Sequence, residues 1–385
     1  MYFYNKHNIV KKDVDSVVKS LKQNFITKGK FLSLFEKKLK DFFKSKYCLV
    51  FSNGTMALFS IAKALSWNEN SHIILSPISF VAGANSVVNS NSNLHFADID
   101  KYFCLDPYET EKKIIELKKK KKRVSAIIVT DYGGNPANWK KFYKIKKKYK
   151  LILINDNCHS IGSKYNNSYK YATKFADIVV HSYHAVKNIT TGEGGSILTN
   201  NKKIYEKLKL IREHGFIKKK LTFPWSYDLD FEGYNARLSE MNCALGFSQL
   251  DRIEEIIKER NKLANRYNKI FSKIEGIKIP PSPSPGTLCS YHLYPLRFDW
   301  KRLGIKKIDL YEKLKKKFHI QLQVHYVPTY KFSYFKKKFK FSKTKLLNTE
   351  KFYEEAFSIP IFIGMKNKDI LYISKAIIKS ISNLK

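Results

Sequence analysis

Residues 181–200, HSYHAVKNITTGEGGSILTN, place one lysine between an apolar strand and a glycine-rich turn. A lysine in a chain with 72 Lys and Arg residues is ordinarily a surface charge, but Lys187 is the only one in this stretch. Because it follows the strand and precedes the turn, we expect its amine to project into a cleft. A desolvated lysine has a lowered pKa and becomes a nucleophile or a base. Lys187 is therefore the first candidate for covalent chemistry.

A second segment, SNGTMALFSIAKAL at 52–65, turns from a strand through Gly54 into an alanine-rich helix. Glycine lets the backbone approach a ligand closely, and the free N–H groups at the start of a helix suit a phosphate. Thr55 adds a hydroxyl group. The alternative is a helix cap without a ligand, and this segment alone does not decide between the two.

A third segment, LILINDNCHSIG at 151–162, ends a buried strand on Asp156. A buried carboxylate is costly unless it is paired, and a cationic ring nitrogen would be a suitable partner. His159, three residues later, has a ring that can hydrogen-bond a neighbouring group. The alternative is an ordinary loop aspartate with a structural histidine.

Short apolar runs that are rich in β-branched residues alternate with longer helical patterns. Such alternation predicts an α/β fold with a mostly parallel sheet covered on both faces, and ligands bind at the carboxyl ends of its strands. The expected helices include 55–65, 110–121 and 138–149. The expected strands are 48–52, 72–75, 94–97, 126–130, 151–154, 178–181 and 196–199.

The second half of the chain predicts a smaller domain. One long helix is expected over 239–274, and the segment IPPSPSPGT at 279–287 is the clearest interruption of the pattern. We predict a large domain over residues 1–245, including an N-terminal helical segment. A small C-terminal α+β domain is expected over 246–385.

Composition narrows the class of protein. The chain has 385 residues and is 43% hydrophobic, which suffices for a sizeable core. It shows no run of about 18 apolar residues for a membrane span and no secretory signal. Its five cysteines are scattered without a CxxC pair or a zinc-type cluster, so we expect neither disulfides nor a metal. These features favour the cytoplasm.

The net charge of +39 raises the alternative of a regulatory or nucleic-acid-binding protein. The lysine runs at 118–122, 146–148, 218–220, 315–317 and 336–338 are spread between apolar segments and form no single basic arm. We read them as solvated helix faces and turns, and we expect no nucleic-acid partner. A positive field would still help to attract a diphosphate substrate.

Taken together, the three segments resemble, in order and spacing, the DegT/DnrJ/EryC1/StrS family of sugar aminotransferases. The resemblance covers essentially the whole chain. It implies the fold-type-I architecture of enzymes that use pyridoxal 5′-phosphate (PLP). It continues through TKGKFLSLFEKKL (27–39), SPISFVAGAN (76–85), GYNARLSEMNCALGFSQLDRIEE (233–255) and VHYVP (324–328).

The resemblance implies a role for each matching residue. Lys187 matches the lysine that binds PLP as a Schiff base and shuttles a proton. Asp156 matches the carboxylate that keeps the pyridine nitrogen protonated. His159 stands beside the position of the phenolic oxygen, and Phe80 matches the aromatic residue that stacks on the ring. The phosphate cradle is matched by Gly54, Thr55 and Ser182.

The resemblance also implies a homodimer with active sites at its interface, because Asn235 matches a phosphate contact from the neighbouring subunit. Some family members have histidine in place of the lysine and perform dehydration instead. The presence of Lys187 therefore argues for transamination, with L-glutamate as the expected amino donor.

Four stretches are most similar to the members that act in pseudaminic acid synthesis: 76–82, 184–191, 212–219 and 323–335. That likeness implies amination at C4 of a UDP-linked 4-keto-6-deoxy-N-acetylhexosamine, giving UDP-4-amino-4,6-dideoxy-N-acetyl-β-L-altrosamine. Gly192 departs from the alanine expected in this subgroup. The rival products are perosamine-like or bacillosamine-like. The expected substrate contacts, with ordinary packing as the alternative, are His214, Arg237, Tyr291, His292, His325 and Tyr326.

Overall fold

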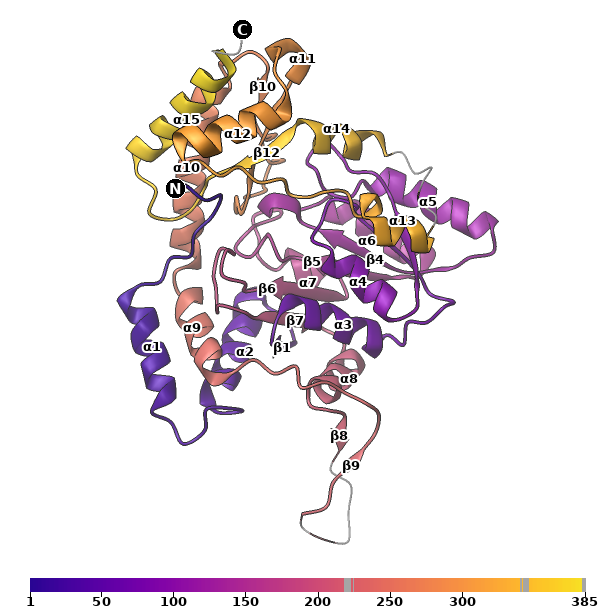
Figure 1. The fold of residues 1–385 in the computed structure, drawn as a ribbon. Helices are drawn as coiled ribbons and strands as arrows, with labels where there is room; N and C mark the ends of the chain where they lie inside the picture. Colours follow the sequence, from indigo (N-terminus) through magenta and orange to yellow (C-terminus); the bar gives the residue numbers. More distant parts are fainter. Residues whose placement is uncertain (218–222, 224, 340, 342–345, 383–385) are drawn as a thin grey trace.

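Seven short strands form one central sheet in the spatial order β1-β7-β6-β5-β4-β2-β3. The computed structural model describes residues 1–217, 223, 225–339, 341 and 346–382 (Figure 1). All the strands run parallel except β7, which is antiparallel to both of its neighbours. The strands are β1 (Tyr47–Phe51), β2 (His72–Leu75), β3 (Asn93–Phe96), β4 (Val124–Thr130), β5 (Ile152–Asp156), β6 (Ile178–Ser182) and β7 (Gly195–Thr199).

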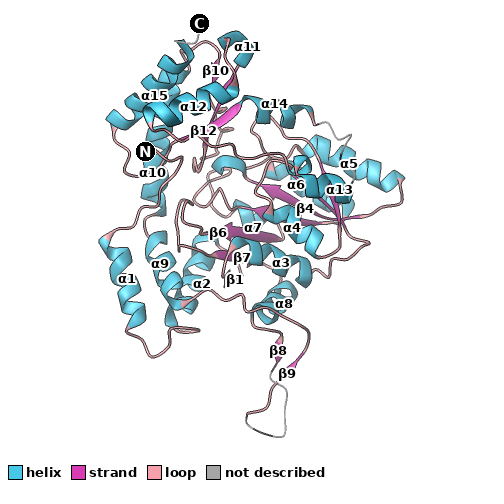
Figure 2. Ribbon diagram, viewed as in Figure 1, coloured by secondary structure: helices cyan, strands magenta, loops and turns pink. Residues whose placement is uncertain are grey.

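All seven predicted strands are present, with bounds within two residues of the prediction. Their apolar side chains alternate between two hydrophobic cores, so that Ile127 packs on one face of the sheet and Ile128 on the other. Helices cover both faces (Figure 2), which confirms the predicted α/β class. One face carries α2 (Lys30–Phe43), α5 (Pro107–Lys119), α6 (Trp139–Tyr149), α7 (Tyr171–Phe175) and α9 (Glu240–Leu250). The other carries α3 (Gly54–Ala64), α4 (Ala82–Asn89) and α8 (Lys202–Arg212).

The strands end together at one edge of the sheet. Thr130 at the end of β4 pairs with Asp156 at the end of β5, and Ser182 closes β6 beside them. The helix α3 begins at Gly54, directly after β1. This edge therefore collects the polar groups that the sequence placed after each strand.

The predicted single helix over 239–274 is wrong, because the chain breaks into α9 and α10 (Ile253–Phe271). At the break, Arg252 has a φ of −101° and a ψ of 6°. Its guanidinium lies 2.8 Å from the buried carboxylate of Asp13, which also accepts a hydrogen bond from Gln249. The turn thus lets two side chains reach Asp13, which belongs to α1 (Lys11–Leu21).

A second, three-stranded antiparallel sheet lies at the C-terminal end of the chain in the order β10-β11-β12. Its core is made with α10, α12 and α15 and is separate from the two cores of the large sheet. Shorter elements connect these parts. The remaining elements are β10 (Ile277–Lys278), β11 (Tyr294–Phe298), α11 (Trp300–Leu303), α12 (Lys307–Phe318), α13 (Ser333–Phe339), α14 (Leu347–Glu355), β12 (Ala356–Ile359) and α15 (Asn367–Ser382).

The first residues of the chain lie against this C-terminal part. Tyr2 forms a parallel bridge with Ile320, and the carbonyl of Tyr4 accepts a hydrogen bond from the amide of Ile361 at 3.1 Å. Figure 1 shows the N-terminus beside α10 and α12. The predicted boundary between residues 245 and 246 falls inside α9 and stays a prediction.

One hairpin projects from the outside of the molecule. A hairpin of β8 (Phe216–Ile217) and β9 (Asp228–Leu229) extends away from the large sheet (Figure 1). The lysine run 218–220 and the end of the 212–219 stretch lie outside the described residues. None of the helices in the described ranges combines the length and apolar character needed to cross a membrane.

Candidate active site

A cavity of about 800 Å³ opens at the edge where the strands end. Ten of the fourteen predicted site residues line it, although they come from six separate segments of the chain. This volume is typical of a site for a small molecule or a cofactor. The ten residues are Gly54, Thr55, Phe80, Asp156, His159, Ser182, Lys187, His292, His325 and Tyr326.

Lys187 lies in the loop after β6 and faces this cavity. Burial lowers the pKa of its amine, while the nearby Cys158 thiol and Asp156 carboxylate oppose that shift. Its Nζ makes no hydrogen bond or ion pair with another residue of the described part of the chain. The N-terminal segment holds this loop in place, because Asn5 Nδ2 donates a hydrogen bond of 2.7 Å to the carbonyl of Val186. The amine is thus desolvated, positioned and free to react.

Asp156 ends β5 with its carboxylate 8% exposed. It accepts hydrogen bonds of 3.2 Å from the Thr130 hydroxyl and from the Cys158 amide. No ion pair joins it to a cationic group among the described residues. A buried carboxylate needs more compensation than two neutral donors supply. Its environment suits a ligand that brings a protonated nitrogen.

The imidazole of His159 is held between two partners. The amide of Gly133 donates to its Nδ1 at 3.3 Å, and its Nε2 lies 3.0 Å from the Tyr326 hydroxyl. Burial, with Lys187 and His325 nearby, lowers the pKa of His159 well below its usual range. Because Nδ1 accepts, the neutral ring carries its proton on Nε2 and donates it to Tyr326. The Tyr326 hydroxyl then has its own proton to donate.

The start of α3 forms one wall of the cavity. The Asn53 side chain caps the helix by accepting a hydrogen bond of 2.8 Å from the Met56 amide. The amides of Gly54 and Thr55 make no hydrogen bond within the described residues, as expected for a first turn. A Cβ at Gly54 would come within 3.1 Å of the Ser182 Cβ, so glycine allows α3 to approach β6. The free amides and two hydroxyls suit a phosphate.

Aromatic rings complete the lining. Phe80 is 59% exposed and meets Tyr326 edge-on, with ring centroids 6.2 Å apart. His292 is buried against His159 with centroids 4.6 Å apart, and its Nδ1 has no partner among the described residues. His325 Nδ1 lies 2.9 Å from the Ser358 hydroxyl. One face of Phe80 is thus open for a flat ligand.

Four predicted residues lie outside the cavity. Tyr291 is buried, and its carbonyl accepts a hydrogen bond from Arg260 at 2.8 Å. His214, Asn235 and Arg237 lie near the base of the β8–β9 hairpin. Asn235 is exposed and forms an isolated bridge with Glu213, whose carboxylate is 3.2 Å from Arg237 Nη1. Their predicted roles stay predictions.

Some residues that line the cavity were not predicted from the sequence. Cys158 and Thr130 adjoin Asp156, and the strand ends could have drawn attention to both. Gln323 begins the 323–335 stretch and lines the cavity beside Val324. Tyr4 carries no local signal, because only the tertiary fold brings the N-terminus to this site.

The model of the DegT/DnrJ/EryC1/StrS aminotransferase family matches residues 7–378. The chain belongs to this family. It is therefore an aminotransferase, and the predicted resemblance is confirmed. The family also confirms PLP as the predicted cofactor.

Relatives of this DegT/DnrJ/EryC1/StrS member cover its full length. A UDP-4-amino-4,6-dideoxy-N-acetyl-β-L-altrosamine transaminase of Campylobacter jejuni is 34% identical over 100% of this chain and 99% of the relative. A Helicobacter pylori transaminase of the same name is 33% identical, with the same coverage. The solved structure of Helicobacter pylori PseC, an aminotransferase involved in the biosynthesis of pseudoaminic acid, superposes with a TM-score of 0.91. Its sequence is 32% identical, and 99% of each chain is covered.

The cavity of this family member fits PLP by its own chemistry. It holds an amine for an aldehyde, an uncompensated carboxylate for a ring nitrogen, and unpaired amides for a phosphate. Phe80 presents an open aromatic face to a planar ring. Each group of the cofactor thus has a matching group in the cavity.

Proposed function

We propose that this aminotransferase transfers an amino group from L-glutamate to C4 of a UDP-linked 4-keto-6-deoxy-N-acetylhexosamine. The product would be UDP-4-amino-4,6-dideoxy-N-acetyl-β-L-altrosamine. The observation that carries the reaction type is the meeting of Lys187 and Asp156 in one cavity. The names and full-length similarity of the relatives support the choice of sugar.

Five groups of this chain would hold the cofactor. The amides of Gly54 and Thr55, with the Ser182 hydroxyl, would bind its phosphate. Phe80 would cover one face of the ring. His159 would stand beside the phenolic oxygen, where Tyr326 fixes the imidazole by the 3.0 Å contact.

Lys187 would act as the proton carrier of the reaction. Burial lowers the pKa of its amine, so a larger neutral fraction is present at a given pH. The neutral Nζ can accept a proton from the α-carbon of the amino donor and return it as a general acid. A lysine at this position therefore serves as both nucleophile and base.

Asp156 would hold a proton on the ring nitrogen. When bound, PLP supplies an electron-withdrawing ring that stabilises negative charge on the carbon that loses its proton. The Asp156 carboxylate is oriented for this role by the hydrogen bonds from Thr130 and Cys158. Its own burial strengthens the pairing, because the site excludes water.

The sugar nucleotide would approach from the C-terminal side of the cavity. His325, Tyr326 and His292 line that side and are the proposed sugar contacts. Tyr291 lies behind them, where its role would be to support His292. Arg237 and His214 lie outside the cavity of their own chain, so their proposed contact would be made in the site of a partner subunit.

The substrate assignment can be tested with a panel of keto sugars. Purified, PLP-saturated enzyme would be offered L-glutamate with UDP-, GDP- and dTDP-linked 4-keto sugars, and 2-oxoglutarate release would be measured. We expect turnover with the UDP-linked sugar of the L-arabino series. Turnover only with a GDP-linked or a D-series sugar would overturn the assigned sugar substrate but not the aminotransferase activity.

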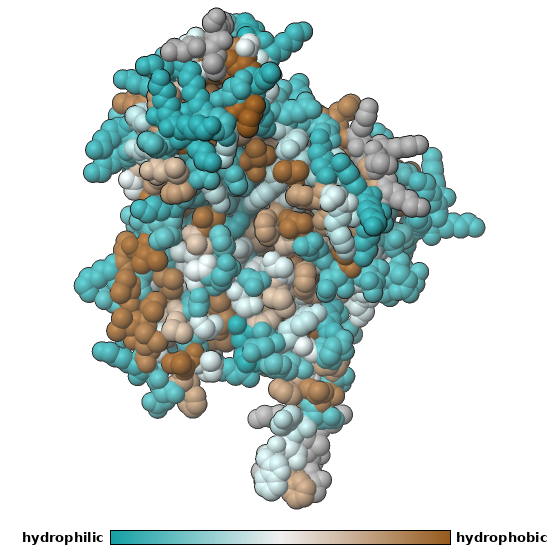
Figure 3. Space-filling view, in the orientation of Figure 1, coloured by the Kyte–Doolittle hydropathy of each residue, from teal (hydrophilic) through white to brown (hydrophobic). Residues whose placement is uncertain are grey.

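We propose a homodimer in which each subunit completes the site of the other. Asn235 is exposed and outside its own cavity, although it matches a phosphate contact. The neighbouring β8–β9 hairpin extends away from the large sheet of its own chain (Figure 1). A brown apolar area follows α1 in Figure 3. It includes Val14, Val18 and Leu21, which are 51%, 44% and 52% exposed and share one helix face.

The dimer can be tested by placing charge on that face. The variant Val14→Glu/Val18→Glu should shift the molecule to a monomer in analytical ultracentrifugation, because a buried interface does not tolerate unpaired carboxylates. The matched control is Ile308→Glu on α12, a residue that is 57% exposed. A dimer that survives the α1 substitutions would show that this face is not the interface.

We also propose a cytoplasmic location. All five cysteines are free thiols, and four of them are buried. Disulfides form and persist in oxidising compartments, so free cysteines favour a reducing one. Detection of the enzyme in a periplasmic or secreted fraction would contradict this location.

A further inference from the structure

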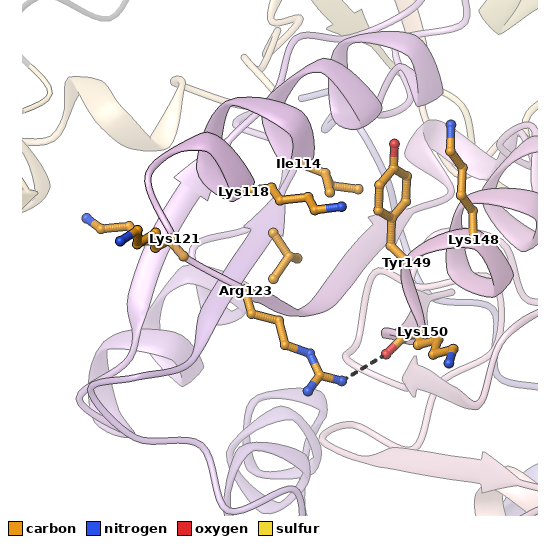
Figure 4. A pocket seen from close by; sticks show the side chains of 9 residues that line it. Ile114, Lys118, Lys121, Arg123, Lys148, Tyr149 and Lys150 are labelled. Carbon is orange, nitrogen blue, oxygen red and sulfur yellow. Dashed lines mark hydrogen bonds between the residues drawn. The ribbon is translucent and has the colours of Figure 1, made fainter.

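A second cavity, of about 410 Å³, lies at the opposite edge of the large sheet (Figure 4). It opens where β4 begins and where α5 and α6 end. The length of β4, seven residues, places it roughly 20 Å from the catalytic edge. It is lined by Ile114, Lys118, Lys121, Lys122, Arg123, Val124, Lys148, Tyr149 and Lys150.

The fold brings two distant lysine runs together here. The runs at 118–122 and 146–148 read as separate solvated stretches in the sequence, yet both contribute to this cavity. They meet because β4 and β5 are neighbours, so the helices that precede the two strands, α5 and α6, end side by side. Six of the nine lining residues are cationic and none is acidic. The cavity therefore concentrates positive charge.

Little of this charge is compensated nearby. Lys148 is paired with Glu111 at 2.7 Å, and Arg123 makes only a long contact of 3.5 Å with the carbonyl of Lys150. The other four lysines make no ion pair with the described residues. Like charges held this close repel one another, and a bound anion relieves the repulsion.

Helix capping does not explain the whole cluster. Lys118 is in the last turn of α5 and Lys148 is in the last turn of α6, where cations stabilise the helix terminus. Lys122 and Arg123 lie beyond the end of α5, and Lys150 is the residue that follows the last turn of α6, so their side chains add charge beyond the last turns.

The cavity also has an apolar floor and an aromatic wall. Ile114 and Val124 are buried beneath it. Figure 4 shows Lys118 extending toward Tyr149 across Ile114, with Arg123 below and Lys121 turned away. The Tyr149 hydroxyl lies 2.9 Å from Glu111, which fixes the ring. Such a site can hold an anionic group and a flat apolar group together.

We propose that this cavity binds a small polyanion through a diphosphate group. Ammonium and guanidinium groups bind phosphate oxygens by charge-assisted hydrogen bonds. A concave site of this volume fits a small molecule better than a polymer, which would need a continuous groove. The ligand is either inorganic diphosphate or a nucleoside diphosphate whose base packs on Tyr149.

The first experiment measures binding of inorganic diphosphate by calorimetry on the PLP-saturated enzyme. The cavity variant is Lys118→Gln/Lys122→Gln/Arg123→Gln. The control variant is Lys315→Gln/Lys316→Gln/Lys317→Gln on α12. Both lower the net charge equally, from +39 to +36 (39 − 3). We expect about tenfold weaker binding in the cavity variant alone, since each lost contact to phosphate weakens affinity severalfold.

The second experiment separates the two ligand sources. Adenosine diphosphate is compared with inorganic diphosphate on the wild type and on Tyr149→Leu. If the base packs on the ring, Tyr149→Leu weakens only the nucleotide; if the two ligands respond alike, the ligand is inorganic diphosphate. Either result supports the diphosphate site. An unchanged absorbance of the bound cofactor would show that each variant is folded.

Three results would overturn the proposal. Equal weakening in the cavity and α12 variants would show that the field of the whole chain, rather than this cavity, attracts the anion. Unchanged binding in the cavity variant would place the anion elsewhere. Absence of diphosphate binding, with tight salt-sensitive binding of single-stranded RNA lost in the cavity variant, would assign the cavity to nucleic acid.

Discussion

The two ends of strand β4 carry the same type of residue in opposite environments. At its carboxyl end, Lys187 is desolvated in the cavity of the candidate active site, and its amine has no hydrogen bond or ion pair among the described residues. At its amino end, Lys118, Lys122 and Lys150 are exposed around the second cavity. A buried lysine can lose its proton and react, whereas exposed lysines remain charged and attract anions. The surroundings, rather than the residue type, thus set the chemistry.

The acidic residues sharpen this contrast. The edge with the candidate active site has Asp156, a buried carboxylate that makes no ion pair with the described residues. The opposite edge has no acidic lining residue among those described, and Glu111 stands outside it. One edge therefore suits a ligand with a positive nitrogen as well as a phosphate, and the other suits a ligand with negative charge alone.

Substitution of Lys187 should give the largest effect. Lys187→Ala removes both the nucleophile and the base, so we expect aminotransferase activity to fall by at least about 10³-fold. The absorbance of the cofactor bound through lysine should also be lost, as measured by spectrophotometry. Lys118→Ala is the control at the other edge and should leave both signals intact. A Lys187→Ala enzyme with the native spectrum would refute the assignment.

Removal of the negative charge of Asp156 should have the second largest effect on activity. Asp156→Asn keeps the size of the side chain but removes its charge, so we expect kcat/KM to fall by about 10²-fold. Steady-state kinetics with L-glutamate would measure this. Thr130→Val removes only one hydrogen bond to Asp156 and should cost far less. Equal losses of kcat/KM in the two variants would mean that the negative charge of Asp156 does not contribute to activity.

Acid stability should depend on a histidine near the second cavity. His95 in β3 lies 2.9 Å, between Nε2 and Nδ1, from His72 at the start of β2, and burial lowers the pKa of His95 to about 3. The unfolded chain, with a histidine pKa near 6.5, binds more protons between pH 6.5 and pH 3. Stability contributed by the neutral ring is therefore lost as the pH falls through that window.

The substitution His95→Gln tests this dependence. Urea denaturation at pH 7 and pH 4 should show about 1–3 kcal/mol less acid destabilisation in the variant than in the wild type. His7→Gln, at an exposed position, is the control and should behave as the wild type does. An unchanged pH dependence in His95→Gln would contradict a neutral, buried ring.

The smallest effect should come from Tyr326. Tyr326→Phe removes the hydroxyl that accepts from His159 but keeps the ring beside Phe80. We expect kcat/KM to fall roughly threefold to tenfold, since one neutral hydrogen bond is lost. Tyr334→Phe changes an exposed ring and should have no effect. A loss as large as that of Asp156→Asn would instead make Tyr326 a proton donor in the reaction.

The sequence predicted the residues that line the cavity at the strand ends because its signals are local. Gly54, Asp156 and Lys187 each lie at or after the end of an apolar strand, and parallel strands bring their carboxyl ends together. The break at Arg252 could not be predicted from the local sequence, because the residue with which Arg252 forms an ion pair, Asp13, lies 239 residues away.

The second cavity could not be predicted from the sequence for a related reason. The order of the strands determines which helices become neighbours, and neither lysine run carries information about the other. Asn235 shows the same limit in another form. Its predicted phosphate contact needs a partner subunit, which the arrangement of a single chain cannot supply.

The attachment of Asn5 to the loop of Lys187 has a consequence for the synthesis of the protein. The amide oxygen of Asn5 is held by Arg260, which follows it by 255 residues. This hydrogen bond cannot form until that much of the chain has been synthesised. All strands of the large sheet precede Arg260, so the sheet can form earlier as the chain grows. The loop of Lys187 would thus gain this support only after the sheet that carries it.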